Sequence, residues 1–523
     1  MTKSIHLLLF AFIISAAQAS SAADQAPNII VILADDLGYG DLHRDGGLPP
    51  TPHCDRLATE GMRFTDAHTT SSVCTPTRYG ILTGRYNWRS PLKKSVLFGL
   101  DTPLIPTSRL TLPAYLQQQN YHTAIVGKWH LGLGWQKLPN GETRKASSGD
   151  TEGKGWDIDY SKKVSGGPTA LGFDQSYIIP ASLDMFPYVY LKNDKPTQEA
   201  TLTKAFSRPG PAGKDFDAIN CLKDFARASR AYIKTRAAEK DKPFFLYLPL
   251  TSPHTPILPS KAWQGKSSIG AYGDFLMETD WVVGEVLAEL DQQKLSQNTM
   301  VIFVTDNGCS PAAKIPDLVA QGHKPNGDLR GHKADIYEGG HRIPFIVRWP
   351  AKVKAGSTAN QTICTSDIFA TAADIHGKLD SIPASAAEDS FSFLSILNGK
   401  NPPKEIRPFT IHHSINGSFA IRKGKWKLAL CPGSGGWSQP KPKQALKDMS
   451  LPNVQLFDLE ADLAEQHNLQ AKHPDVVQEL VKELATAINA GRTTSGPQQS
   501  NDGYPNTFSQ RVLKEFPILA EKK

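Results

Sequence analysis

Short, almost wholly apolar runs recur along the chain, and each of them ends in a polar loop. They cover residues 28–34, 123–126, 243–249, 300–305 and 344–349. Runs of this length that are rich in β-branched and aromatic residues are typical of strands buried on both faces. Helical patterns lie between them, over residues 217–238 and 273–293. We therefore predict an α/β fold with a large, mostly parallel sheet sandwiched by helices.

The composition changes near residues 380–403, where Ser, Ala and Pro are frequent. Beyond this connection, residues 418–430 predict a hairpin that turns at Gly424. A helix is predicted from Pro474, with five apolar residues on one face: Val477, Leu480, Val481, Leu484 and Ile488. The pattern predicts a larger domain over residues 23–380 and a smaller C-terminal α+β domain over residues 381–523.

Residues 132–208 show no regular pattern and are rich in Gly, Pro, Ser and aromatic residues. A long insertion of this kind commonly places loops over a functional site. We consider five residues in it as candidates for substrate contact, with core packing as the alternative for each: Trp135, Trp156, Asp184, Tyr188 and Tyr190.

The N-terminus has the features of a secretory signal peptide over residues 1–22. Lys3 precedes an apolar run from Leu7 to Ala17, and small residues follow up to Ala22. No later stretch approaches twenty apolar residues. We predict an exported protein, periplasmic or secreted, without a membrane anchor after cleavage.

The overall composition is that of a globular protein, with 40% apolar and 21% charged residues among 523. The formal net charge of +7 falls to +6 when Lys3 is removed with the signal. This mild basicity favours encounter with an anionic polymer, although ordinary surface lysines explain it equally well. Nucleic acid is not an expected partner, because no long basic run or aromatic-basic motif occurs. The six cysteines include no C-x-x-C pair, so their spacing assigns no disulfide.

Cys74 stands at a predicted helix start, in the segment Ser-Val-Cys-Thr-Pro-Thr-Arg. Pro76 suits the first helical turn, and Gly84 can end the helix. Cys74 would then lie at the positive end of the helix dipole, with Arg78 on the same face. The alternative is an ordinary buried cysteine on a short helix.

Oxygen ligands follow two of the predicted strands directly. Asp35 and Asp36 come after residues 28–34, and Asp306 and Asn307 come after residues 300–305. Open α/β sheets bind their ligands at the carboxyl ends of the strands. Adjacent, partly buried carboxylates require a cation such as Ca²⁺ or Mg²⁺. An exposed Asp-rich turn is the alternative.

Basic residues occupy further loops of the same kind. Lys128 and His130 follow residues 123–126, His254 follows residues 243–249, and Lys333 lies in a Gly-punctuated loop. Each one alone is commonly structural. Together with Cys74, Arg78 and the acidic residues, they describe a site that holds a small tetrahedral oxyanion between a divalent metal and basic side chains.

Two segments resemble the signatures of type I sulfatases of the alkaline phosphatase superfamily. Cys-Thr-Pro-Thr-Arg at 74–78, continued through Thr83-Gly84, resembles the main signature. Residues 121–130, Tyr-His-Thr-Ala-Ile-Val-Gly-Lys-Trp-His, resemble the second one, except that Asn120 stands where glycine is usual. We expect this departure to affect a turn and not the chemistry. The resemblance implies an alkaline-phosphatase-like fold, with residues 23–380 as the catalytic domain.

The resemblance also implies a modified residue and a metal. In this family the signature cysteine, here Cys74, is oxidised to Cα-formylglycine (3-oxoalanine) by a maturation enzyme. One hydroxyl of the hydrated aldehyde attacks sulfur, and the other then expels sulfate. One Ca²⁺ ion is implied, with an oxygen of modified Cys74 and four side chains as its ligands: Asp35, Asp36, Asp306 and Asn307.

The remaining roles also come from the resemblance. Arg78 and Lys128 would hold the aldehyde hydrate. Lys333 and His254 would bind sulfate and protonate the leaving oxygen, and His130 would be the base that collapses the intermediate.

The signature segments look most like those of bacterial relatives of arylsulfatase A and N-acetylgalactosamine-6-sulfatase. The predicted substrate is therefore a sulfated carbohydrate, with a 6-O-sulfated galactose or N-acetylgalactosamine unit as the hypothesis. His412, His413 and Asn416 are candidates for the border of a sugar pocket. Two alternatives stay open: a phosphate or phosphonate monoester hydrolase of the same superfamily, and a non-catalytic sulfoglycan-binding homologue.

Overall fold

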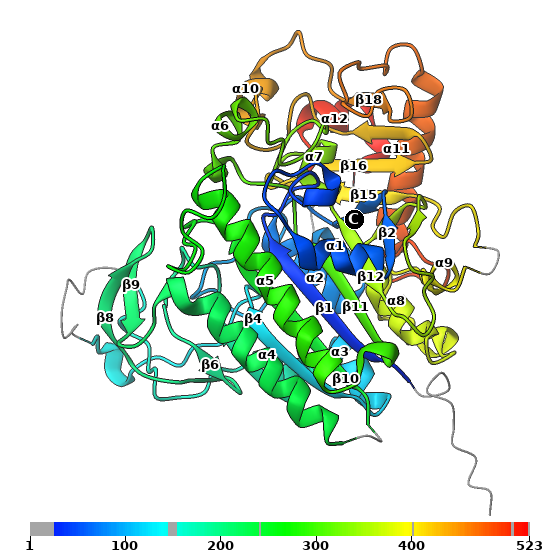
Figure 1. Ribbon diagram of the computed structural model, residues 1–523. Coiled ribbons are helices and arrows are strands. Elements are labelled where there is room, and N and C mark those ends of the chain that lie inside the picture. The colour runs from blue at the N-terminus through cyan, green and yellow to red at the C-terminus, as the bar shows by residue number, and fades with distance from the viewer. Residues whose placement is uncertain (1–25, 145–153, 240–241, 400–401, 504–506, 521–523) are drawn as a thin grey trace, which may run out of the picture.

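The computed structural model describes residues 26–144, 154–239, 242–399, 402–503 and 507–520 (Figure 1). The predicted signal peptide at residues 1–22 lies outside this part of the chain. Within the described part, no helix is both long and apolar enough to cross a membrane. All six cysteines are buried and none is in a disulfide.

A ten-stranded mixed sheet forms the centre of the molecule. Its middle strands are parallel, in the order β11 (Thr299–Thr305), β1 (Asn28–Asp35), β10 (Phe244–Pro253), β4 (His122–Lys128) and β5 (Gln175–Ile179). One edge adds β12 (Phe345–Arg348), β2 (Met62–Phe64) and β13 (Ser357–Ala359), and the other adds β6 (Leu191–Lys192) and β7 (Lys195–Pro196). The predicted apolar runs thus form the sheet.

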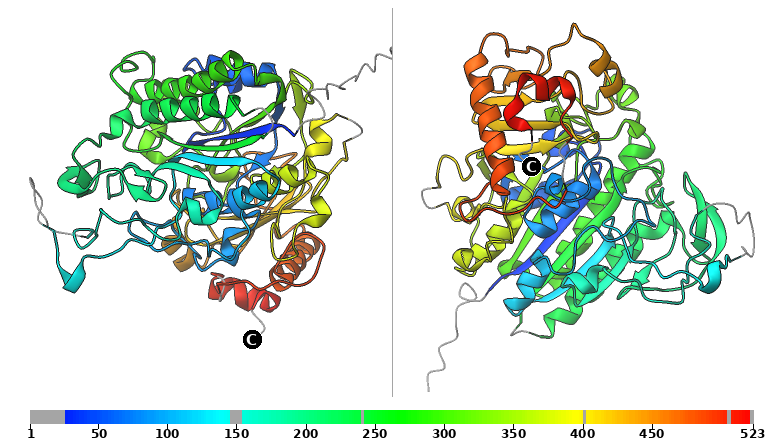
Figure 2. Two further views of the ribbon diagram at one scale, coloured as in Figure 1. Left: turned by 90° about the horizontal axis from the view of Figure 1, so that it is seen from below. Right: turned by 180° about the vertical axis from the view of Figure 1, so that it is seen from behind.

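Helices cover both faces of this sheet (Figure 2). Ile30 and Ile32 of β1 pack into a core with α1 (Pro52–Thr59), α4 (Cys221–Ala237) and α5 (Ala271–Gln292). The alternate residues Ile29 and Val31 pack into the opposite core, which includes α2 (Cys74–Thr83), α3 (Leu112–Gln118) and α8 (Asp367–Asp374). Strand alternation therefore supplies both cores, and the predicted α/β sandwich is confirmed.

A second, four-stranded antiparallel sheet lies in the C-terminal part of the chain. It is built from β15 (Thr410–His413), β16 (Phe419–Lys423), β17 (Trp426–Ala429) and β18 (Gln455–Asp458). The predicted hairpin is β16–β17, and the apolar face of α11 (Pro474–Ala490) packs on this sheet. Phe393 and Leu397 pack instead with the core of the large sheet. The domain boundary at residue 380 stays a prediction.

Smaller elements complete the described fold. They are β3 (Ala67–His68), β14 (Ile363–Cys364), β8 (Ala200–Ala205), β9 (Pro209–Gly213), α6 (Ile315–Ala320), α7 (Glu338–His341), α9 (Leu394–Leu397), α10 (Pro442–Lys447) and α12 (Gln510–Glu515). The irregular segment 132–208 therefore includes strand β5 and the start of a β8–β9 hairpin. Only five residues form β5, and two of them are polar, so the sequence pattern gave no strand signal there.

Candidate active site

The carboxyl ends of four parallel strands bring the predicted site residues together. Because β4, β10, β1 and β11 are neighbours in the sheet, the residues at their ends share one edge. Asp35 ends β1, Lys128 ends β4, and His254 and Asp306 directly follow β10 and β11. Helix α2 brings Cys74 to the same edge of the sheet. The Cys74 sulfur lies 3.7 Å from Asp35 Oδ1.

The acidic centre of the site consists of three carboxylates and one amide, and all four side chains are buried: Asp35, Asp36, Asp306 and Asn307. Asn307 Nδ2 donates to Asp36 Oδ1 at 2.8 Å, and the Asp36 amide donates to Asp306 Oδ1 at 3.2 Å. Asp36 adopts a left-handed backbone conformation with φ of 66°. Such a conformation costs free energy at a non-glycine residue, and functional sites are where such costs are commonly found.

Three buried cations balance these carboxylates. Lys128 Nζ lies 2.6 Å from Asp35 Oδ2, and Arg78 Nη2 lies 2.8 Å from Asp306 Oδ2. Lys333 Nζ lies 2.7 and 2.8 Å from the two carboxylate oxygens of Asp36. Burial alone would raise the pKa of Asp35, but Lys128, His254 and Arg78 hold it well below its usual value.

Helix α2 presents Cys74 as its first residue and ends at Gly84, which has φ of 63°. The prediction of a helix that begins at Cys74 and stops at Gly84 is confirmed. Arg78 lies one turn later and donates from Nη1 to the Lys128 carbonyl at 3.0 Å. Burial raises the pKa of the Cys74 thiol to about 12, although Lys128 and Lys333 act in the opposite direction. A thiol in these surroundings stays protonated at neutral pH.

Ser182 belongs to the same cluster and was not predicted. Its hydroxyl lies 3.3 Å from Lys128 Nζ and 3.1 Å from His254 Nδ1. Ser182 comes shortly after β5, so it too lies beyond the carboxyl end of a parallel strand. The rule that located the other residues would have located Ser182 if β5 had been recognised as a strand.

The His130 ring is buried beside this cluster. Its Nε2 atom lies 2.7 Å from the Leu97 carbonyl, and its buried Nδ1 atom has no hydrogen-bond partner among the described residues. Burial, with Lys128 and Arg78 nearby, holds the pKa of His130 well below its usual value. A neutral ring that donates from Nε2 has its lone pair at Nδ1.

The donors present fit a hard divalent cation. Ligand atoms of Asp35, Asp36, Cys74 and His254 all lie within 4.8 Å of one another. The buried Oδ1 atom of Asn307 has no partner among the described groups, which is costly unless something binds it. Burial and the neighbouring Asp35 raise the pKa of Asp306 to about 7, so the carboxylates are crowded enough for a cation to relieve their repulsion.

Asn120 adopts φ of 65°, a conformation that glycine favours and asparagine tolerates. The departure from the signature at this position therefore falls on a turn, as expected. In contrast, His412 and His413 are buried residues of strand β15 in the smaller sheet, and His412 stacks on His341 with ring centroids 3.9 Å apart. Tyr190 stacks on Tyr177 in the core, which is the structural alternative considered for it.

The fold and the site together define a class of protein. Strand-end carboxylates, buried cations and a helix N-terminus at one sheet edge suit a hydrolase that acts on esters of a tetrahedral oxyanion. A Sulfatase family model matches residues 27–378, and the chain belongs to the sulfatase family.

Relatives extend this similarity over most of the chain. N-acetylgalactosamine-6-O-sulfatase of Bacteroides thetaiotaomicron is 35% identical over 499 residues, which cover 87% of this chain and 92% of the relative. Arylsulfatase A of Bos taurus is 30% identical, with 94% and 93% covered. A solved B. thetaiotaomicron structure, described under the metabolism of multiple glycosaminoglycans, superposes with a TM-score of 0.76 at 32% identity, covering 88% of this chain and 99% of the other. The protein is thus a sulfatase, an enzyme that hydrolyses sulfate esters.

Proposed function

We propose that this sulfatase removes sulfate from a sulfated carbohydrate outside the cytoplasm, with a 6-O-sulfated galactose or N-acetylgalactosamine unit as its substrate. The observation that carries this proposal is the similarity to the N-acetylgalactosamine-6-O-sulfatase of B. thetaiotaomicron over nearly the whole length of both chains. The secretory features of residues 1–22 support an extracytoplasmic substrate.

The nucleophile in this proposal is residue 74 after conversion of Cys74 to formylglycine by a maturation enzyme. The unconverted thiol suits the reaction poorly, because burial raises its pKa to about 12. An aldehyde hydrate at this position would supply the oxygen that attacks sulfur and a second hydroxyl that releases sulfate. Arg78 and Lys128 would hold such a group, which is supported by the hydrogen bond between them and by the electrostatic interaction of each with Cys74.

Asp35, Asp36, Asp306 and Asn307 would hold one Ca²⁺ ion, together with an oxygen of the converted residue 74. Bound calcium would supply Lewis-acid chemistry at the nucleophile and neutralise sulfate charge. The charge count supports a divalent cation. When ionised, the three carboxylates balance Arg78, Lys128 and Lys333, so a sulfate monoester would otherwise add an uncompensated negative charge to a buried site.

The other side chains move protons and orient sulfate. Lys333 and His254 lie 2.7 Å and 3.6 Å from carboxylate oxygens of Asp36 and would bind the sulfate oxygens and protonate the leaving oxygen. His130 would act as the base, for which its unpartnered Nδ1 lone pair is suited.

Peptide mass spectrometry over residues 72–85 tests the nucleophile. Conversion of Cys74 makes this peptide about 18 Da lighter, whereas the common thiol oxidations add mass. An unmodified cysteine in fully active protein would contradict the proposal. An unmodified cysteine in inactive protein would instead favour the non-catalytic sulfoglycan-binding alternative.

Substrate assays test the rest of the proposal. We expect sulfate release from N-acetylgalactosamine 6-sulfate and from sulfated oligosaccharides. Turnover of matched sulfate and phosphate esters separates the sulfatase from the phosphate or phosphonate hydrolase alternative. Release from small aryl sulfates alone would refute a carbohydrate substrate.

A further inference from the structure

A cavity of about 1000 Å³ lies beside the active site and has no role in the chemistry described above. Its lining combines aromatic and charged side chains, among them Phe98, Asp101, Lys137, Trp156, Phe186 and Arg208. This volume is in the range of ligand sites that hold a molecule of one or two sugar rings.

Two segments connect the cavity to the catalytic residues. In the first, Leu97 donates its amide to Thr75 Oγ1 at 3.2 Å and accepts from His130 Nε2 at 2.7 Å, and the next residue, Phe98, lines the cavity. In the second, Ser182 contacts Lys128 and His254, and Phe186 lines the cavity four residues later. Two short segments therefore run from the sulfate site to the cavity, and Asp184, which contacts Arg208, is close enough to His254 and Lys128 to interact with them electrostatically.

Arg208 is a fixed but accessible cation in this cavity. Its Nη1 atom donates to the Asp184 carbonyl at 3.1 Å and also contacts the Asp184 carboxylate, while Tyr188 donates to the Arg208 carbonyl at 2.6 Å. The side chain is nevertheless 46% exposed. Its Nε and Nη2 atoms make no hydrogen bond to any described residue, so two donors are available to a ligand.

Phe98 provides an exposed aromatic ring next to this arginine. The ring is 48% exposed, and Arg208 Cζ lies 5.7 Å from its centroid. An exposed aromatic face beside a fixed guanidinium suits a sugar ring that carries an anionic group. The C–H face of the sugar can pack on the aromatic ring, while the guanidinium pairs with the anion in a bidentate manner.

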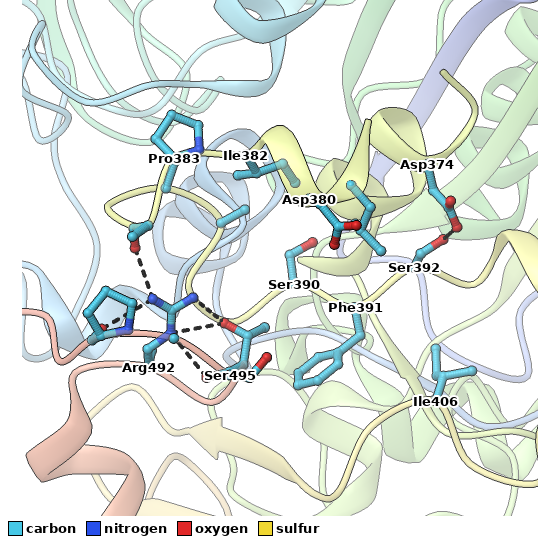
Figure 3. Close-up of a pocket in the computed structure, with 17 residues that line it drawn as sticks. Asp374, Asp380, Ile382, Pro383, Ser390, Phe391, Ser392, Ile406, Arg492 and Ser495 are labelled. Carbon is cyan, nitrogen blue, oxygen red and sulfur yellow. Dashed lines mark hydrogen bonds between the residues drawn. The ribbon is translucent and has the colours of Figure 1, made fainter. Parts of the chain in front are cut away.

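A second cavity, which Arg492 lines, offers no such available cation among its lining residues (Figure 3). There Arg492 is only 8% exposed, and every one of its guanidinium nitrogens donates to a protein oxygen of Ala384, Thr494 or Pro497. Arg492 is therefore committed to holding the surrounding loops together, whereas Arg208 is not.

We propose that Phe98 and Arg208 form a subsite for the sugar next to the one that is desulfated, and that this neighbouring sugar carries a carboxylate or a second sulfate. Asp184 is the positioning residue that fixes Arg208. The inference rests on the proposed carbohydrate substrate and adds the requirement for a second anionic group to it.

The experiment compares kcat/KM of the wild type, Arg208→Gln and Arg208→Lys on three 6-O-sulfated disaccharides. The neighbouring sugar is neutral in the first, carries a uronic acid carboxylate in the second and carries a second sulfate in the third. We expect the wild type to prefer at least one anionic disaccharide. We also expect Arg208→Gln to lower the anionic-to-neutral ratio of kcat/KM by about tenfold or more, because hydrogen bonds to charged groups are lost. The anionic disaccharide whose ratio falls identifies the source of the charge.

Arg208→Lys retains the charge beside Asp184 but loses the planar guanidinium. It should therefore lower the anionic-to-neutral ratio of kcat/KM less than Arg208→Gln does. Arg230→Gln is the matched control, because Arg230 is 43% exposed and also ion-paired but lies on α4 outside the cavity. It should leave the ratio unchanged. Equal ratios for the wild type and Arg208→Gln, with turnover of all three disaccharides, would overturn the subsite alone. Failure of the wild type to hydrolyse any carbohydrate sulfate would overturn the proposed substrate as well.

Discussion

A thiol nucleophile needs its thiolate form, and the surroundings of Cys74 oppose that form. The side chain is buried beside the Asp35 carboxylate, and its pKa is raised to about 12. The side chains around it suit an oxygen nucleophile better. Lys128 and Lys333 are cations within hydrogen-bonding distance of the carboxylate oxygens of Asp35 and Asp36. Fixed positive charges of this kind stabilise a negatively charged oxygen. At the scale of one residue, the site is therefore consistent with a converted Cys74.

Cys74→Ala should abolish sulfate release, with a loss of more than about 10³-fold, because the nucleophile is removed. Stability should change by only about 1–2 kcal/mol, since one small buried group is lost. Cys221→Ala is the matched control. Cys221 is equally buried, and burial also raises its pKa to about 12, but it lies on α4 away from the site. Sulfate release and urea unfolding measure both effects, and a Cys74→Ala enzyme of wild-type activity would disprove the assignment.

Asp306→Asn should weaken calcium binding while keeping the size of the side chain. For the wild type, a hundredfold excess of calcium over Kd should stabilise the fold by about 2.7 kcal/mol, visible as a higher Tm. The variant should lose most of this shift, because it lacks one of the three carboxylates in the cluster. Asp328→Asn removes an acid whose side chain is 84% exposed and should keep the full shift. An equal calcium-dependent Tm shift in Asp306→Asn would exclude Asp306 as a ligand.

At the scale of one element, helix α2 connects Cys74, the proposed nucleophile, to the core. It carries Cys74 at one end and Gly84, in a left-handed conformation, at the other. A β-carbon on Gly84 would lie 2.9 Å from Ala387, so both the conformation and the space require glycine.

Gly84→Ala should therefore destabilise the fold by about 2–3 kcal/mol, from the left-handed conformation and from overpacking. Its effect on kcat should be small, because Gly84 comes ten positions after Cys74, which is about 15 Å along the helix axis. Gly377→Ala is the matched control, since Gly377 has nearly the same φ of 62° but nothing within 4 Å of its β-carbon position. Urea unfolding should show a loss of only about 1 kcal/mol for this control. Equal losses for both variants would rule out the steric contribution.

The sequence predicted the elements that have strong apolar periodicity and the site residues that directly follow them. Asp35, Lys128 and Asp306 were located because each one ends or follows a buried strand. Ser182 and Arg208 were not located as site residues, because short strands with polar residues leave no periodic signal in segment 132–208. Ser182 and Arg208 belong to their sites through contacts with residues that are distant in the chain, and the order of residues does not reveal such contacts.

At the scale of the whole molecule, a buried network of ionic and imidazole groups connects the smaller sheet to α7 and β3. Lys427 of β17 lies 3.0 Å from Glu338 and 2.8 Å from Glu465, with all three side chains buried. Lys427 Nζ also lies 3.0 Å from His341 Nε2. Breaking a buried pair leaves an uncompensated charge, so this network holds the smaller sheet against α7.

Three histidines belong to this network, and the sequence pattern did not group them because residues 68, 341 and 412 are far apart in the chain. His68 Nδ1 lies 3.1 Å from His341 Nδ1, and the His412 ring stacks on His341. Burial lowers the pKa of His68 and holds those of His341 and His412 well below the usual value, with Lys427 acting in the same direction on the latter two. The carboxylates of Glu338 and Asp66 and the guanidinium of Arg422 also face these rings.

The three histidines of this network should make the folded state lose stability as the pH falls below 6.5, whereas Glu465, whose pKa is raised to about 7 by burial, acts in the opposite direction. In the unfolded chain these histidines take up protons near pH 6.5, whereas in the folded chain their depressed pKa values keep them neutral. The unfolded state then binds more protons, so stability is present above pH 6.5 and is lost as the pH falls, by up to about 1.4 kcal/mol per pH unit for each histidine.

Urea midpoints at pH 7.5, 6.5 and 5.5, at constant ionic strength, measure this slope. His412→Gln should be less stable than the wild type at pH 7.5, because it loses the stacked ring, but it should show a shallower slope by about one proton. His467→Gln removes a histidine whose side chain is 79% exposed and should keep the wild-type slope. A wild-type midpoint that does not change between pH 7.5 and 5.5 would mean that the network accepts protons in the folded state. Those protons would be bound either by Glu465, whose pKa is raised to about 7, or by histidines paired with Glu338 and Asp66.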